Sequence, residues 1–100
     1  MRLTLEQRER IVRTVRDQIG RDSAVWLYGS RTRADSRGGD VDLLIRSSRA
    51  IDATEQARLH GRLEQELSLP VDVSFIDPSR GMNRFQRLVA AEAVPLDVSP

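Results

Sequence analysis

Residues 24–45 decide the fold, and they read AVWLYGSRTRADSRGGDVDLLI. Two short apolar runs inside this stretch, Ala24–Tyr28 and Val41–Ile45, are β-prone and predict buried strands. Between them, residues 31–39 are rich in glycine, serine and arginine and form the one long break between apolar segments. Irregular segments often carry function in small domains, so this break is the first place to expect a site.

Helical signals flank the two predicted strands. On the amino-terminal side, Thr4 followed by Gln7 resembles a capping box, which predicts a helix that ends near Gly20. On the carboxyl-terminal side, Asp52 with a glutamate three residues on is a second cap signal, and this helix ends before Pro70. The apolar positions at helical spacing are Leu5, Ile11, Val12, Val15 and Ile19 in the first helix, and Ala53, Ala57, Leu59, Leu63 and Leu67 in the second.

A third strand and a last helix complete the pattern. The strand fits Val71–Ile76, and Asp77 before a proline predicts a turn after it. Apolar spacing then predicts a helix that continues to about Ala93, before a tail that contains two prolines. The residues expected on its inner face are Met82, Phe85 and Leu88. Excess apolar surface at these positions would instead mark a partner interface.

Composition limits the function classes that fit. The chain has 100 residues, enough for a single domain over 1–100, and its formal net charge is +1. A net charge this close to zero creates no strong electrostatic field that would attract nucleic acid or a membrane surface. Cysteine is absent, which excludes a disulfide scaffold and a thiolate zinc site, and lysine is absent, which excludes a P-loop lysine. With a single histidine, His60, any metal is held by oxygen. The amino-terminal residues lack a signal-peptide pattern, and the expected location is the cytoplasm.

Three aspartates interrupt the apolar strands. Asp40 and Asp42 alternate along the start of one strand, and Asp72 lies in the next. Because side chains alternate between the faces of a strand, the first two project from the same face about 7 Å apart. Clustered carboxylates repel each other, and a divalent ion such as magnesium or manganese relieves that repulsion. The alternative is that these aspartates are solvated or paired with arginine at the strand ends.

A glycine–serine pair marks the end of the first predicted strand. Gly29 and Ser30 stand where free backbone N–H groups can point at an anion and where only glycine lets a phosphate approach closely. Arg31 and Arg33 follow and are available to neutralise phosphate charge. Taken singly, the pair also fits an ordinary turn, and the arginines fit ordinary surface charge.

Taken together, these features resemble the minimal nucleotidyltransferases (MNT) of the DNA polymerase beta superfamily. The resemblance rests on three blocks, WLYGSR at 26–31, RGGDVDLLI at 37–45 and VDV at 71–73, and the order of elements agrees over nearly the whole chain. It implies an α+β protein with the nucleotidyltransferase fold, a small mixed β-sheet flanked by helices. The expected order is helix, strand, loop or short helix, strand, helix, strand, helix.

The resemblance also implies roles for individual residues. In the family, a glycine–serine turn binds the nucleoside triphosphate, and three aspartates hold two divalent ions. Those roles fall on Gly29 and Ser30, and on Asp40, Asp42 and Asp72, which would be both metal ligands and catalytic residues. The nucleotide substrate would be ATP with Mg²⁺, or with Mn²⁺ in its place. Asp72 is the best candidate to take the proton of the attacking hydroxyl.

The resemblance also points to an acceptor for the transferred group. Proteins that look like this are often encoded beside a HEPN-domain toxin and act as its antitoxin, in some cases by transferring AMP to it. The resemblance therefore implies a HEPN-domain partner. Two alternatives stay open: a binding module with the same fold that neutralises its partner without catalysis, and an enzyme that modifies a small molecule.

Overall fold

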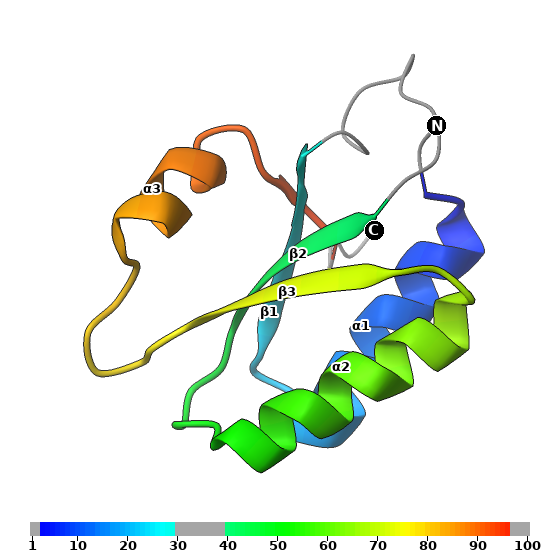
Figure 1. Cartoon of the computed structure of the whole chain (residues 1–100), viewed down its shortest axis with the longest axis horizontal. Helices are drawn as coiled ribbons and strands as arrows, with labels where there is room; N and C mark the ends of the chain where they lie inside the picture. Colours follow the sequence, from blue (N-terminus) through cyan, green and yellow to red (C-terminus); the bar gives the residue numbers. More distant parts are fainter. Residues whose placement is uncertain (1–2, 30–39, 97–100) are drawn as a thin grey trace.

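Four strands form one mixed sheet in the order β3-β2-β1-β4 in the computed structural model, which describes residues 3–29 and 40–96 (Figure 1). β1 (Ala24–Tyr28) is antiparallel to β2 (Val41–Arg46), and β2 is parallel to β3 (Val71–Ile76). The α+β class and the mixed sheet are as the sequence predicts. The short helix considered between the first two strands falls on residues outside those described.

Two long helices cover one face of the sheet. α1 (Leu5–Ile19) starts with the predicted capping box at Thr4, and α2 (Ala53–Leu67) starts at the predicted cap Asp52. They lie side by side (Figure 1), and their buried residues pack with those of the strands. Leu5, Ala53 and Ala57, which the sequence places in the apolar stripes, are exposed. The main core between these layers consists of Ile11, Val15, Ile19, Val25, Leu27, Val41, Leu43, Ile45, Leu59, Leu63, Leu67, Val71 and Leu96. No helix in the described part of the chain is long and apolar enough to cross a membrane.

The opposite face of the sheet carries a smaller cluster and the third helix. Because neighbours along a strand alternate between faces, Tyr28, Leu44 and Ile76 point away from α1 and α2 and form a second buried group. α3 (Arg84–Ala90) lies on this side (Figure 1), and its residues Val89 and Ala90 pack against that group. Trp26 and Phe75 are half-buried; Trp26 packs against this group and Phe75 against the main core.

The prediction that Met82, Phe85 and Leu88 form the buried inner face of the last helix is wrong. Phe85 and Leu88 leave 51% and 70% of their surface exposed, and Met82 lies before the helix with 37% exposed. The residue of α3 that is buried is Gln86, whose Nε2 donates to the hydroxyl of Ser74 at 2.9 Å and to the Phe75 carbonyl at 2.8 Å. These hydrogen bonds to β3 set the rotation of the helix, and an apolar-spacing argument does not anticipate them.

The end of the chain also differs from the prediction. The helix stops at Ala90 rather than near Ala93, and the proline-containing tail includes a short strand, β4 (Val94–Pro95), antiparallel to β1. A proline is tolerated there because β4 is an edge strand. The next residue, Leu96, donates its N–H to the Val25 carbonyl at 2.9 Å and is buried in the main core.

Replacing Gln86 should release α3 from the sheet. The Gln86→Ala variant loses both bonds to β3 and leaves the Phe75 carbonyl without its side-chain donor, so we expect a loss of about 1–3 kcal/mol in the free energy of unfolding. Urea titration measures this change. Gln18→Ala is the control, because Gln18 makes an exposed bond to Arg62 and its loss should cost less than about 0.5 kcal/mol. Equal costs for the two variants would contradict the anchoring role.

Candidate functional site

Two carboxylates and a tyrosine form one row across three strands. Strand pairing places Tyr28 opposite Asp42, and Asp42 opposite Asp72. Residues that are paired in this way point to the same side of a sheet, and neighbouring strands lie about 4.8 Å apart. The row therefore stands on the sheet face that α1 and α2 leave uncovered. Tyr28 is buried, Asp42 is half-buried and Asp72 is exposed.

The start of β3, which carries Asp72, is held by α2 and β2. Glu64 of α2 accepts the N–H of Val71 at 2.9 Å, and His60 Nε2 lies 2.7 Å from the Val71 carbonyl oxygen. Val41 at the start of β2 donates to the Pro70 carbonyl at 2.9 Å. His60 and Glu64 thus act as positioning residues for the row. The sequence alone does not indicate this role, and its one signal for the pair is their spacing of four residues on a helix.

Like charges gather around Asp42. Its pKa is raised above the ordinary value of 3.8, first by burial and then by the charges of Asp72 and Asp40. Asp40 itself is exposed and lies just before β2. The charges of Asp72 and Asp40 are therefore close enough to disfavour the ionised form of Asp42. An electrostatic arrangement of this kind is typical of functional sites.

Tyr28 links the carboxylates to α3. Burial raises the pKa of its hydroxyl, and the charges of Asp42 and Asp72 raise it further. Its ring meets that of Phe85 edge-on, with centroids 6.0 Å apart and planes at 76°. The structure places Tyr28 in the smaller core cluster, with the carboxylates as neighbours.

Gly29 brings the backbone against the Asp42 carboxylate. Its φ of +80° lies in the region that favours glycine, and a Cβ at this position would overlap the carboxylate and lie 3.1 Å from its Cγ. A turn without a side chain is therefore required here. Ser30, Arg31 and Arg33, which the sequence also assigns to the site, lie outside the described residues.

Asp40, Asp42 and Asp72 suit a hard divalent cation by their chemistry. Within 3–29 and 40–96, no group of three or more histidine, cysteine or acidic side chains is close enough to hold a metal ion. Magnesium, however, is commonly bound by one or two carboxylates together with substrate phosphates. Asp42 and Asp72 meet that requirement as facing oxygen donors whose mutual repulsion a cation would relieve. The assignment of these residues as metal ligands stays a prediction.

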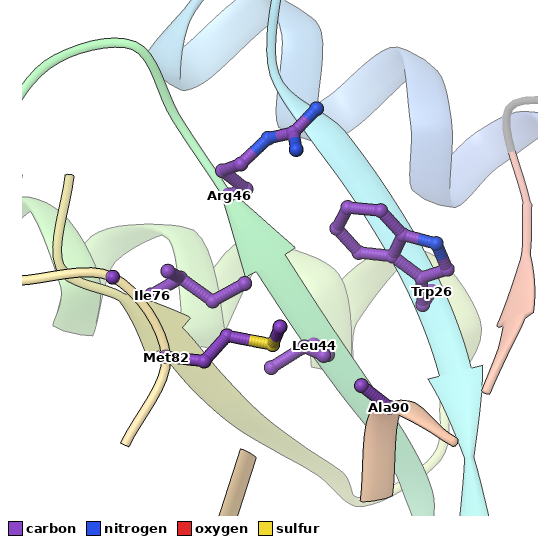
Figure 2. Close-up of a pocket in the computed structure, with 7 residues that line it drawn as sticks. Trp26, Leu44, Arg46, Ile76, Met82 and Ala90 are labelled. Carbon is purple, nitrogen blue, oxygen red and sulfur yellow. The ribbon is translucent and has the colours of Figure 1, made fainter. Parts of the chain in front are cut away.

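An apolar pocket opens on the same sheet face, beyond the carboxylate row. Its volume is about 360 Å³, and Trp26, Leu44, Ile76 and Met82 supply most of its walls. The guanidinium of Arg46 stands over the Trp26 ring, 5.4 Å from the centroid (Figure 2). Along β2, Leu44 lies between Asp42 and Arg46 on this face. The face is therefore negative at one end and apolar with one positive group at the other.

Comparisons with known proteins give a consistent result. The sequence profile of the nucleotidyltransferase domain matches residues 8–94. A comparison with curated proteins gives no significant match. Among solved structures, an MNT antitoxin in complex with a tri-AMPylated HEPN toxin of Shewanella oneidensis has a TM-score of 0.74 and 18% identity, covering 96% of this chain and 74% of that chain.

Two further solved structures show the same fold. A toxin–antitoxin structure with AMP-PNP has a TM-score of 0.76 and 18% identity, and the match covers 97% of this chain and 75% of that one. A protein assigned as a minimal nucleotidyltransferase has a TM-score of 0.64 and 27% identity, and the match covers 93% and 96% of the two chains. The mixed sheet and helices described above are therefore those of the nucleotidyltransferase fold.

Adding a methyl group at Gly29 should disturb the Asp42 carboxylate. We expect Gly29→Ala to lower the free energy of unfolding by more than about 1 kcal/mol, because it adds both backbone strain and overlap. Gly81→Ala is the matched control, since Gly81 has a φ of +75° but open space around its Cβ. In an Asp42→Ala background, the cost at position 29 should fall toward that at position 81. An unchanged cost in that background would show that the carboxylate is not the obstacle.

Removing the charge of Asp42 should change the pH dependence of stability. A carboxyl whose pKa is raised on folding destabilises the folded state when ionised, so wild-type stability falls as pH rises from 3.8 through the raised pKa. We expect Asp42→Asn to lose this fall and to be at least as stable as the wild type at neutral pH without metal.

Unfolding curves measured between acidic and neutral pH check this, with Asp17→Asn on α1 as the control. An Asp42→Asn protein that is less stable than the wild type at neutral pH would show that the carboxylate makes stabilising contacts in the absence of metal.

Proposed function

This chain belongs to the nucleotidyltransferase domain family, and we propose that it transfers AMP from ATP to a hydroxyl group of a HEPN-domain partner protein, as the antitoxin of that partner. The observation that carries the proposal is the pair of facing carboxylates, Asp42 and Asp72, beside the side-chain-free turn at Gly29. Support for the partner comes from the similar structures, which include an MNT antitoxin with a tri-AMPylated HEPN toxin and a toxin–antitoxin structure with AMP-PNP.

The carboxylates serve as the metal-binding part of the proposed site. Asp42 and Asp72, with Asp40 just before β2, are the residues that would hold magnesium or manganese. A divalent ion in such a site neutralises phosphate charge and makes a hydroxyl a better nucleophile. Placement of the triphosphate falls to Gly29 with Ser30, Arg31 and Arg33, because a glycine turn lets phosphates approach the backbone and arginine suits phosphate oxygens.

The proposed reaction is a single displacement at phosphorus. The acceptor hydroxyl oxygen forms a bond to the α-phosphorus of ATP, while the bond from that phosphorus to the bridging oxygen breaks and pyrophosphate leaves with its electron pair. The hydroxyl proton goes to a carboxylate. Asp72 is suited to accept it because it is the exposed member of the row and the incoming acceptor can reach it.

A catalytic role explains the clustered carboxylates better than a role limited to blocking the partner by binding it. Burial raises the pKa of Asp42, and the charges of Asp72 and Asp40 raise it further, so the ionised Asp42 is unfavourable in the metal-free protein. A module that only blocks its partner has no need of this arrangement. Transfer to a small molecule differs in the acceptor alone, and the experiment below distinguishes it.

Binding of a non-hydrolysable ATP analogue gives the first test. Calorimetric titration of the full chain should show binding with Mg²⁺, none with EDTA, and none for Asp42→Asn in either condition. Asp17→Asn, a substitution on α1, which covers the opposite face of the sheet, should bind as the wild type does. Binding that is equally strong in EDTA, or that survives in Asp42→Asn, would contradict the metal role of the row.

Transfer is tested with ATP labelled at the α-phosphate and, in parallel, at the γ-phosphate. In the presence of the HEPN-domain protein from the same genome, the α-label should appear on that protein and the γ-label should not. Complex formation without any label would favour the non-catalytic module. Label that appears on a small molecule alone would favour an enzyme that transfers AMP to a small-molecule acceptor.

A further inference from the structure

One face of α3 is apolar and uncovered. Phe85 and Leu88 are one helical turn apart on α3, and Met82 precedes the helix. All three are exposed, although the Phe85 ring also packs edge-on against Tyr28. In the described part of the chain, the remaining large exposed apolar residues are Val94, in the neighbouring strand β4, and Leu5 at the start of α1. Exposed apolar side chains that gather on one element mark an interaction surface rather than scattered surface variation.

Positive charge frames this face. Residues 78–91 contain three arginines, Arg80, Arg84 and Arg87, all of them exposed. The range contains no acidic residue, but Asp77 precedes it, close to Arg80, and Glu92 follows it. None of the ion pairs found among the described residues involves these arginines. Arg87 instead donates to the Met82 carbonyl at 3.3 Å. A surface with this pattern complements an apolar helix face that is flanked by carboxylates.

We propose that Met82, Phe85 and Leu88, together with Arg84 and Arg87, form the docking surface for the acceptor protein, which contributes an apolar helix face flanked by acidic side chains. This inference rests on the proposed function and names the surface that brings the acceptor to the site. Partner helices commonly bind in this way, with apolar anchors at helical spacing and charges at the rim.

The position of α3 fits this role. Phe85 packs edge-on against Tyr28, which lies in the same row as Asp42 and Asp72. Met82 also lines the apolar pocket beside Trp26 (Figure 2), which provides room for one anchoring side chain of the partner. A protein seated on this surface therefore has a hydroxyl-bearing segment within reach of the carboxylate row.

Other occupants suit the surface less well. In a symmetric dimer the same patch meets itself, so the positive charges of Arg84 and Arg87 on both copies would be brought into one interface with no acidic side chain from the patch to balance them. An anionic membrane would be repelled by Asp42 and Asp72 beside the patch, and α3, with seven residues, is short for a helix that lies in a membrane surface. Dimer formation and membrane binding are both among the outcomes that the test below can detect.

The test measures binding of the HEPN-domain protein from the same genome to the full chain, without nucleotide. Leu88→Glu should weaken binding by at least about tenfold, because it places a charge at the apolar centre. Arg84→Glu should weaken binding and reduce its salt dependence. Leu5→Glu is the matched control, since Leu5 is 69% exposed and Leu88 70%, and it should change affinity by less than about twofold. Both leucines are surface residues, so circular dichroism should show all variants folded.

Titration with the ATP analogue is run on the same variants and separates this proposal from the proposed function. Loss of the partner with nucleotide binding retained supports the docking surface, even if no AMP transfer is found in the wild type. The proposal is overturned if the wild type does not bind the HEPN-domain protein, or if Leu88→Glu binds it as tightly as the wild type does. It is equally overturned if Leu88→Glu only disrupts a dimer of this chain or binding to phosphatidylserine vesicles.

Discussion

The parallel pairing of β2 with β3 is the constraint on which the rest of the structure depends. It places Asp42 beside Asp72, and burial together with the charges of Asp72 and Asp40 raises the pKa of Asp42. The pairing persists because the other face of the same strands is buried under α1 and α2, and because Glu64 and Val41 hold the start of β3. Hydrophobic burial on one face thus holds together charges that repel each other on the opposite face.

The sheet divides structural and chemical roles between its two sides. One side carries the main core, and its strand residues are continuous with the apolar stripes of the long helices. The other side carries the carboxylate row, the apolar pocket and the short helix α3. Because a polar residue, Gln86, fastens α3 to β3, Leu88 and about half of the Phe85 surface stay exposed. A small helix attached by hydrogen bonds can present Phe85 and Leu88 without losing its place on the sheet.

Most elements were predictable because each has a local signal. Capping residues and helical apolar spacing located α1 and α2, and short β-branched runs located the three main strands. The failures lie where a long-range contact decides. The Gln86 bonds to β3 rotate α3 away from the orientation that Met82, Phe85 and Leu88 predicted. β4 exists because Val94 meets Leu27, a pairing between segments far apart in the chain. The roles of His60 and Glu64 were not predicted, because they depend on contacts with the backbone of Val71, and the sequence around Val71 does not indicate such contacts.

The sequence by itself determined the fold class, the family resemblance and the identity of the candidate residues, because alternation, capping and the Gly29 and Asp40–Asp42 motifs are local features. Only the tertiary structure decided how those residues are combined. Strand register put Asp72 next to Asp42 rather than one residue away, which would have turned its side chain to the opposite face. The fold also brought the Gly29 backbone against the Asp42 carboxylate and turned an apolar face of α3 outward. These relations depend on distances between segments remote in sequence, and the packing of the core sets them.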